Sequence, residues 1–150
     1  IVPATAVPSY TGPSTYLLAI KYNNYAGSGT GDGRNEMAIV DPSRAQPDPI
    51  IASAQVMSEV LKIVGPTPDA EHPGGVREWC VNTGAVDPAT RSMLINNEDG
   101  RLYRWSFATT QLTESIRFNN GLGQSYTPTA IGADGAVYAI NNAVLFSIGK

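Results

Sequence analysis

Apolar and polar side chains alternate most clearly in the second half of the chain, over Leu102–Phe107. Tyr103, Trp105 and Phe107 fall on one face of an extended segment. Arg104 falls on the opposite face. A period of two residues is typical of a β-strand with one buried face. The pattern therefore predicts a strand whose three aromatic side chains form a packed layer against a neighbouring sheet.

Similar short apolar runs on both sides complete a four-stranded unit. Glu98–Gly100 separates two of these runs and ends in glycine, which readily adopts the positive φ of a hairpin turn. We therefore expect an antiparallel meander. From the innermost to the outermost, its predicted strands are Trp79–Asp87, Met93–Asn97, Leu102–Phe107 and Leu112–Phe118.

Pairs of asparagines indicate that this unit is repeated. The pairs begin at Asn23, Asn96 and Asn141, each after an apolar run, and the last two starts lie 45 residues apart. A short segment led by threonine precedes each run. These segments, each predicted as a short strand, are Thr5–Val7, Thr83–Val86 and Thr129–Ile131. A period in the forties with about four strands per unit is characteristic of the blade of a β-propeller.

The first unit is longer than the others. Tyr16–Ile20 and Glu36–Val40 are predicted strands separated by a Gly-rich loop, and a Pro-rich turn is expected over Asp41–Pro49. Val56–Val64 is predicted to be the outermost strand, although Ser53–Leu61 also fits a short helix.

The fold class predicted from these patterns is all-β, with about three four-stranded antiparallel blades. The blades are expected over about 1–64, 76–118 and 124–150, and the last lacks its outer strand. Closed propellers have about 4–8 blades. We therefore expect an incomplete propeller that is completed in one of two ways. Either a longer parent chain supplies the remaining blades, or two copies join in a six-bladed ring.

Two segments resemble the PQQ-like repeat of quinoprotein-type bacterial β-propellers. They are Asn97–Trp105 and Tyr126–Ala139, which match the family's "Tyr-x-Pro … Asp-Gly-x-Val/Leu-Tyr-Ala" stretch. Ala108–Ile116 departs from the family pattern because it has neither the expected glycine nor the tryptophan. The resemblance implies the shape of a blade. It does not choose among the dehydrogenases, hydrolases, lyases and scaffolds of that class.

Composition and charge exclude several classes of function. The net charge is -3 and the basic residues are scattered, which argues against a nucleic-acid surface. No apolar stretch is long enough to span a membrane. Cys80 is the only cysteine, so an internal disulfide and a cysteine-based metal cluster are both excluded. The compartment stays open, with a secreted or periplasmic location favoured.

Little in the chain points to catalysis. His72 is the only histidine, and no motif joins it to a nucleophile, so a solvated loop is the favoured interpretation and a complete active site is not expected. Asp32, Asn35 and Glu36 in the Gly-rich loop carry oxygens that suit calcium, but their spacing is not that of an EF-hand. A flexible hairpin loop without a cofactor is the favoured alternative.

The start of the innermost strand of the middle unit carries the best candidates for ligand binding. Arg77, Glu78 and Trp79 are expected near the mouth of the propeller channel. The alternative for Trp79 is that it packs between blades, with Cys80 as a small buried residue beside it.

The leading hypothesis for function is a non-catalytic propeller module that presents loops to a ligand or a protein partner. The rival hypothesis is a fragment of a propeller enzyme, either a quinoprotein dehydrogenase or a lactonase-type hydrolase. Such an enzyme would have some of its catalytic groups outside this chain.

Overall fold

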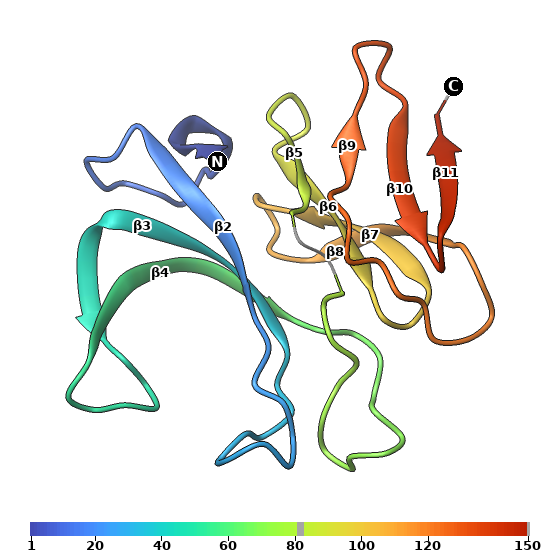
Figure 1. The fold of residues 1–150 in the computed structure, drawn as a ribbon. Helices are drawn as coiled ribbons and strands as arrows, with labels where there is room; N and C mark the ends of the chain where they lie inside the picture. Colours follow the sequence, from blue (N-terminus) through green and yellow to red (C-terminus); the bar gives the residue numbers. More distant parts are fainter. Residues whose placement is uncertain (81–82, 150) are drawn as a thin grey trace.

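The computed structural model describes residues 1–80 and 83–149 and has an all-β fold. Its strands form three antiparallel sheets, with four, four and three strands in chain order (Figure 1). The predicted all-β class is confirmed, and each sheet lies inside one of the three predicted segments. The sheets do not close into a ring.

The first sheet has the order β1-β2-β3-β4. The predicted outermost strand is confirmed as β4, and the alternative helix over 53–61 is wrong. Thr5 lies in a short 3-10 helix, η1 (Ala4–Ala6), instead of in the predicted short strand. The strands are β1 (Val2–Pro3), β2 (Tyr16–Tyr22), β3 (Glu36–Pro47) and β4 (Gln55–Val64).

The predicted Pro-rich turn over 41–49 is wrong in its position, because β3 continues to Pro47. The register between β3 and β4 shifts between Asp41 and Ala45, so the strand bulges at this point. Bulges and strand ends tolerate proline because fewer of their backbone N–H groups are needed for pairing. Pairing resumes and ends at Pro47 with Gln55, and the hairpin turn follows only then.

The second sheet has the order β5-β6-β7-β8 and matches the predicted meander closely. Only its first strand differs clearly from the prediction, because β5 is much shorter than the predicted strand over 79–87. Val81 and Asn82 of that predicted strand lie outside the described residues. The strands are β5 (Ala85–Asp87), β6 (Ser92–Asn97), β7 (Arg101–Ser106) and β8 (Leu112–Arg117).

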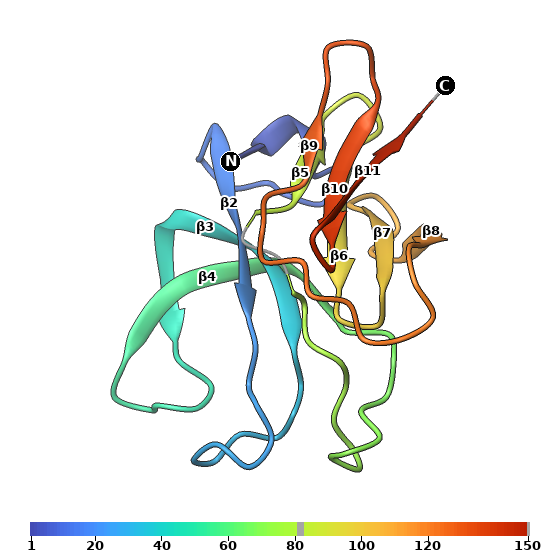
Figure 2. The ribbon, with the colours of Figure 1, turned by 45° about the vertical axis from the view of Figure 1, so that its right-hand side comes forward.

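The third sheet has three strands in the described part of the chain, as predicted for an incomplete last unit. Figure 2 shows its strands beside those of the second sheet. Its order is β11-β10-β9, from β9 (Ala130–Ile131), β10 (Val137–Asn141) and β11 (Val144–Ile148).

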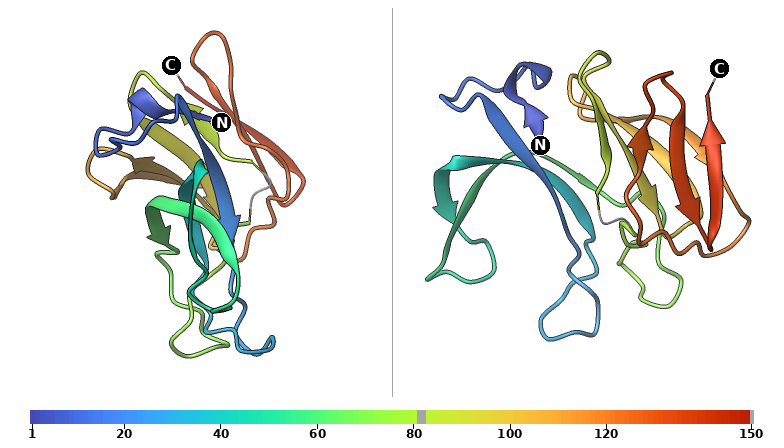
Figure 3. Two further views of the ribbon diagram at one scale, coloured as in Figure 1. Left: turned by 90° about the vertical axis from the view of Figure 1, so that its left-hand side faces the viewer. Right: turned by 45° about the horizontal axis from the view of Figure 1, so that its top comes forward.

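Apolar side chains of adjacent sheets pack into shared clusters. Figure 3 shows the arrangement of the three sheets in two further views. On the face of the second sheet that packs against the first, Trp105 lies edge-to-face on Phe107, with ring centroids 5.6 Å apart. The predicted aromatic layer is thereby confirmed. Between the second and third sheets, Phe118 stacks on Phe146 at 4.3 Å. The first cluster also contains Val2, Val7, Leu17, Met37, Ile39, Leu61, Trp79, Met93, Ile95 and Tyr103.

The asparagine pairs of the first and second sheets tie each of these sheets to the segment that enters the next one. Asn23, at the end of β2, accepts a hydrogen bond from the backbone N–H of Trp79 at 3.4 Å. Asn96, near the end of β6, donates to the Thr129 hydroxyl at 2.9 Å. The two asparagines are first members of their pairs, so the same position in the repeat contacts the following segment twice, once as an acceptor and once as a donor.

In the second and third pairs the second member binds the segment that enters its own sheet, whereas Asn24 of the first pair donates to Asp32 in the β2–β3 loop. Asn97 donates to the backbone carbonyl of Arg77 at 3.3 Å, and Asn142 donates to that of Leu122 at 3.2 Å. The pairs are therefore structural elements of the repeat, and their side chains are used within the protein.

The β2–β3 loop and the β4–β5 connector lie at the bottom of Figure 1. The β6–β7 turn contacts the connector, where the Glu98 backbone N–H donates to the Glu78 carbonyl at 2.9 Å. We call these three segments the loop edge. Within residues 1–80 and 83–149, no helix has the length and apolar character needed to cross a membrane.

Candidate functional site

A polar pocket of about 180 Å³ lies at the loop edge, and we call it the edge pocket. The β2–β3 loop and the β4–β5 connector meet closely at Gly33 and Gly75. A Cβ atom at Gly33 would lie 2.8 Å from the Gly75 Cα, and Gly33 has a positive φ of 74°. A larger residue at this position would force the two walls of the pocket apart. The lining residues are Tyr25, Ala26, Gly33, Asn35, Asp69, Glu71, His72, Val76, Arg77, Glu78 and Glu98.

Arg77 lies at the centre of the charged groups in the pocket. Its guanidinium is 3.3 Å from Asp69 and 3.7 Å from Glu98, and it reaches Glu71 at 4.0 Å. Burial raises the pKa of Glu98, the charge of Arg77 opposes this rise, and the nearby Glu78 adds to it. Glu98 is therefore a carboxylate whose negative charge is only partly compensated.

Glu78 is held by neutral donors from the β2–β3 loop. The Tyr25 hydroxyl donates to its Oε2 at 2.5 Å, and Asn23 Nδ2 donates to the same oxygen at 2.9 Å. Burial raises the pKa of Tyr25, and its hydrogen bond to Glu78 raises it further. The predicted pair Arg77 and Glu78 thus lines one pocket, with partners that come from the preceding sheet.

His72 does not form a catalytic pair with a nucleophile. Its Nδ1 lies 2.9 Å from Asp69 Oδ2, and this hydrogen bond lowers the pKa of Asp69. In residues 1–80 and 83–149, no hydrogen bond connects His72 to a serine or a cysteine. Its carboxylate partner is shared with Arg77.

Trp79, the third predicted binding residue, lies in the core between sheets and is 0% exposed. It packs edge-to-face on Tyr103, with centroids 6.0 Å apart. Cys80 is buried beside it, and burial raises the pKa of the thiol. Both residues have structural partners, which agrees with the packing alternative from the sequence.

The three predicted calcium ligands point to different partners. Asp32 accepts hydrogen bonds from Asn24 and from the Arg34 backbone. Asn35 donates to the Val76 carbonyl at 2.7 Å and lines the edge pocket, whereas Glu36 lies 3.6 Å from Lys62. Across the described residues, no group of three His, Cys, Asp or Glu side chains is arranged to hold a metal ion.

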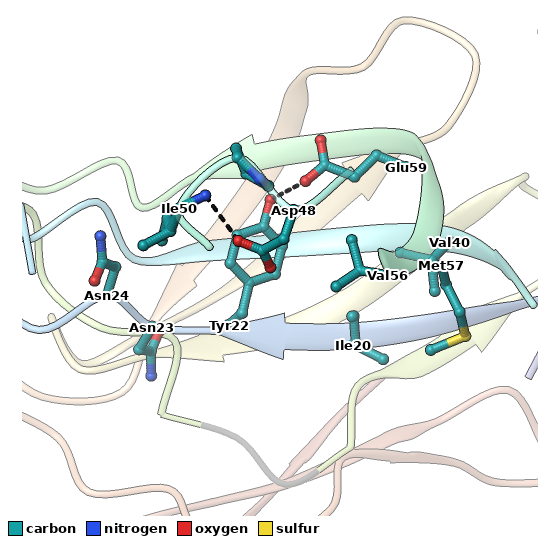
Figure 4. A pocket seen from close by; sticks show the side chains of 11 residues that line it. Ile20, Tyr22, Asn23, Asn24, Val40, Asp48, Ile50, Val56, Met57 and Glu59 are labelled. Carbon is teal, nitrogen blue, oxygen red and sulfur yellow. Dashed lines mark hydrogen bonds between the residues drawn. The ribbon is translucent and has the colours of Figure 1, made fainter. Parts of the chain in front are cut away.

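A second hollow, largely apolar and with a volume of about 380 Å³, lies on the first sheet (Figure 4). Ile20, Val40 and Val56 line it, and the β3–β4 hairpin end brings Ile50 to it. At its polar end the Tyr22 hydroxyl donates to Glu59 at 2.6 Å. Burial raises the pKa of Tyr22, and so does this hydrogen bond. We call this hollow the sheet-1 groove.

Sequence reasoning missed most partners in the edge pocket. Tyr25 is 53 residues from Glu78 along the chain, and no local pattern indicates that they meet. The sequence does carry a signal for Asp69 and Glu98 as pocket residues. Acidic residues are concentrated in the connector and in the β6–β7 hairpin turn. The sheet-1 groove was missed because the β3–β4 turn, which contributes Ile50 to it, was predicted to begin at Asp41, whereas β3 continues to Pro47.

The comparisons with known proteins do not assign a family. No protein-family model matches the chain, and no curated protein matches it.

Proposed function

We propose that this chain is a non-catalytic binding module of the β-propeller type, which takes its ligand at the edge pocket. The observation that carries the proposal is the convergence of three loop-edge segments on one polar pocket. Convergent polar groups in a concavity at one end of a rigid scaffold are the usual form of a binding site.

The propeller part of the proposal is supported by the way the sheets repeat. Each is an antiparallel meander, adjacent sheets bury apolar faces against one another, and the first strand of the second sheet contacts that of the third. The asparagine links described above recur from one sheet to the next. Radial repetition of such units is the principle of a propeller.

The two end sheets support a further part of the proposal, which is that more blades pack on them. The sheet-1 groove lies on the face of the first sheet whose side chains include Ile20 and Tyr22, opposite the core residue Leu17. On the third sheet, Tyr138 and Leu145 are exposed large apolar residues. Blades of a longer parent chain or of a second copy would cover these faces.

The non-catalytic part of the proposal follows from the chemistry of the edge pocket. A nucleophilic mechanism needs a nucleophile next to a base. Here the only histidine is hydrogen-bonded to Asp69, and Glu78 accepts hydrogen bonds from Tyr25 and Asn23. The groups are suited to holding a ligand and offer no activated nucleophile.

Protein-observed NMR of the ¹⁵N-labelled chain tests the binding part of the proposal. A set of small cationic, anionic and neutral compounds is titrated into the protein. We expect at least one class to shift the amides of residues 23–35, 65–78 and 97–100 together. If no class shifts them, the edge pocket is not a binding site.

The non-catalytic part is tested with ester, lactone and alcohol substrates, supplied to the wild type and to His72→Ala. We expect no turnover by either protein. Turnover by the wild type that is lost in His72→Ala would support the enzyme alternative instead.

A further inference from the structure

We propose that the ligand of the edge pocket is an organic cation, a primary ammonium or guanidinium group on a short alkyl stem. This inference rests on the proposed binding function and names the chemistry that the pocket selects. It is argued from the balance of hydrogen-bond donors and acceptors, from charge and from size.

The pocket has acceptors that lack a donor. Asn35 is 5% exposed and lines the pocket, and its Oδ1 atom has no hydrogen-bond partner within the described residues. A buried acceptor without a partner is unfavourable, and a ligand donor would satisfy it. Glu78 receives both of its described hydrogen bonds on Oε2, and Glu98 meets Arg77 through Oε2. Within residues 1–80 and 83–149, no described side-chain hydrogen bond or ion pair reaches the Oε1 atom of either carboxylate, so each Oε1 can accept from a ligand.

Three side chains that can donate hydrogen bonds in the pocket already have acceptors. Tyr25 donates to Glu78, Asn35 donates to the Val76 carbonyl, and the guanidinium of Arg77 is surrounded by carboxylates. A ligand that accepts hydrogen bonds would have to displace one of these contacts. A ligand that donates hydrogen bonds would not.

Charge favours the same ligand. Four carboxylates, those of Asp69, Glu71, Glu78 and Glu98, line the pocket against the single guanidinium of Arg77. Burial raises the pKa of Glu98, and the nearby Glu78 carboxylate raises it further, because like charges at short range disfavour the charged form. A cation between them would remove this repulsion and form charge-assisted hydrogen bonds.

Size distinguishes an organic cation from a larger ligand. The pocket holds about 180 Å³, below the ~300–1,000 Å³ of sites for drug-sized molecules. It therefore suits one group the size of a side chain. Tyr25 lies among the lining residues and is 50% exposed, so its ring can contact the cation or its alkyl stem.

The test is a titration of the ¹⁵N-labelled full chain with n-butylammonium, followed at Gly33, Asn35 and Arg77. The matched probes are n-pentanol, which is neutral, butyrate, which is an anion, and calcium chloride. We expect saturable shifts with n-butylammonium alone. A capped tripeptide with a central lysine forms a second arm, and tighter binding of the tripeptide than of the amine would indicate that a protein segment supplies the cation.

Variants identify the groups responsible. Glu78→Gln and Glu98→Gln should each weaken the binding of n-butylammonium by about tenfold, the typical loss of one charged hydrogen bond. Glu114→Gln removes an equal charge from an exposed site on β8 and should leave the dissociation constant unchanged.

The outcomes separate this inference from the proposed function. Shifts of the same amides by butyrate, n-pentanol or calcium but not by n-butylammonium would overturn the cation assignment and leave the binding module standing. Equal weakening by Glu114→Gln would also overturn it, because the effect would then be one of net charge. If no probe shifts these amides, the cation assignment is overturned together with the binding function.

Discussion

At the scale of single residues, the aromatic side chains of β7 and its surroundings contribute most to the core. Trp105 is 0% exposed and packs on Phe107 from the same end of the strand. Trp79 makes the equivalent contact with Tyr103, whose pKa is raised to about 12 by burial and by its hydrogen bond to Asp99. These side chains join the first two sheets, so their loss would affect both.

Trp105→Ala should reduce the free energy of unfolding by about 3–5 kcal/mol, the usual cost of truncating a buried aromatic side chain. Urea denaturation followed by circular dichroism measures this change. The control is Tyr16→Ala, at an exposed aromatic residue of β2, which should cost about 0.5 kcal/mol or less. Equal losses in both variants would contradict the location of the core between the first two sheets.

At the scale of elements, the bulge in β3 is organised around one carboxylate. Asp41 is buried and accepts hydrogen bonds from Tyr10 at 2.6 Å and from Ser14 at 2.6 Å. The backbone and the hydroxyl of Ser43 add two more. The carboxylate thus fixes the loop between β1 and β2 to the point where β3 loses its register.

The stability that Asp41 contributes should depend on pH. Burial raises the pKa of its carboxyl, but the hydrogen bonds from Ser14, Tyr10 and Ser43 outweigh burial and hold the pKa well below its usual range. A group whose pKa is lower in the folded state contributes stability above its unfolded pKa of about 3.9 and loses it as pH falls toward the folded value. The difference in stability between the wild type and Asp41→Asn should therefore be greatest near neutral pH and shrink below about pH 4.

Urea denaturation of both proteins from pH 7 to pH 2 measures this difference. Tyr10→Phe removes one of the four donors to Asp41 and should show a smaller difference with the same trend. A difference that stays constant over the whole pH range would contradict the assigned role of the carboxylate.

At the scale of the whole molecule, the three sheets leave two large faces open. The sheet-1 groove lies at one end of the stack, and the face with Tyr138 and Leu145 lies at the other. Exposed apolar side chains that gather on one face usually mark an interface. In the isolated chain only another copy could cover these faces.

The isolated chain should therefore self-associate at micromolar concentrations, and static light scattering over a dilution series would detect this. Leu145→Lys places a charge on the exposed face of β11 and should shift the equilibrium toward monomer. Leu122→Lys, at an exposed apolar residue in the segment between β8 and β9, is the matched control and should associate like the wild type. A cooperatively folding monomer at all concentrations would contradict the proposal that further blades pack on the end sheets.

The sequence by itself determined the all-β class, the three units and most strands of the second sheet. These features depend on local patterns, because alternation sets the buried face of a strand and a hairpin turn pairs it with its neighbour. For this reason β6, β7 and β8 lie within one residue of their predicted bounds. Arg77 and Glu78 were predicted near the mouth of a propeller channel, and the structure shows both of them in the lining of the edge pocket.

The tertiary structure alone decided the length of β3 and the composition of the edge pocket. The prolines after Asp41 indicate a turn locally, but pairing with β4 and four hydrogen bonds to Asp41 maintain the strand through a bulge. Tyr25, Asp69 and Glu98 meet Arg77 and Glu78 only because two sheets stack and bring their loops to the same edge. Contacts between sheets join residues far apart in the chain, and local patterns of side chains do not encode which of them come together.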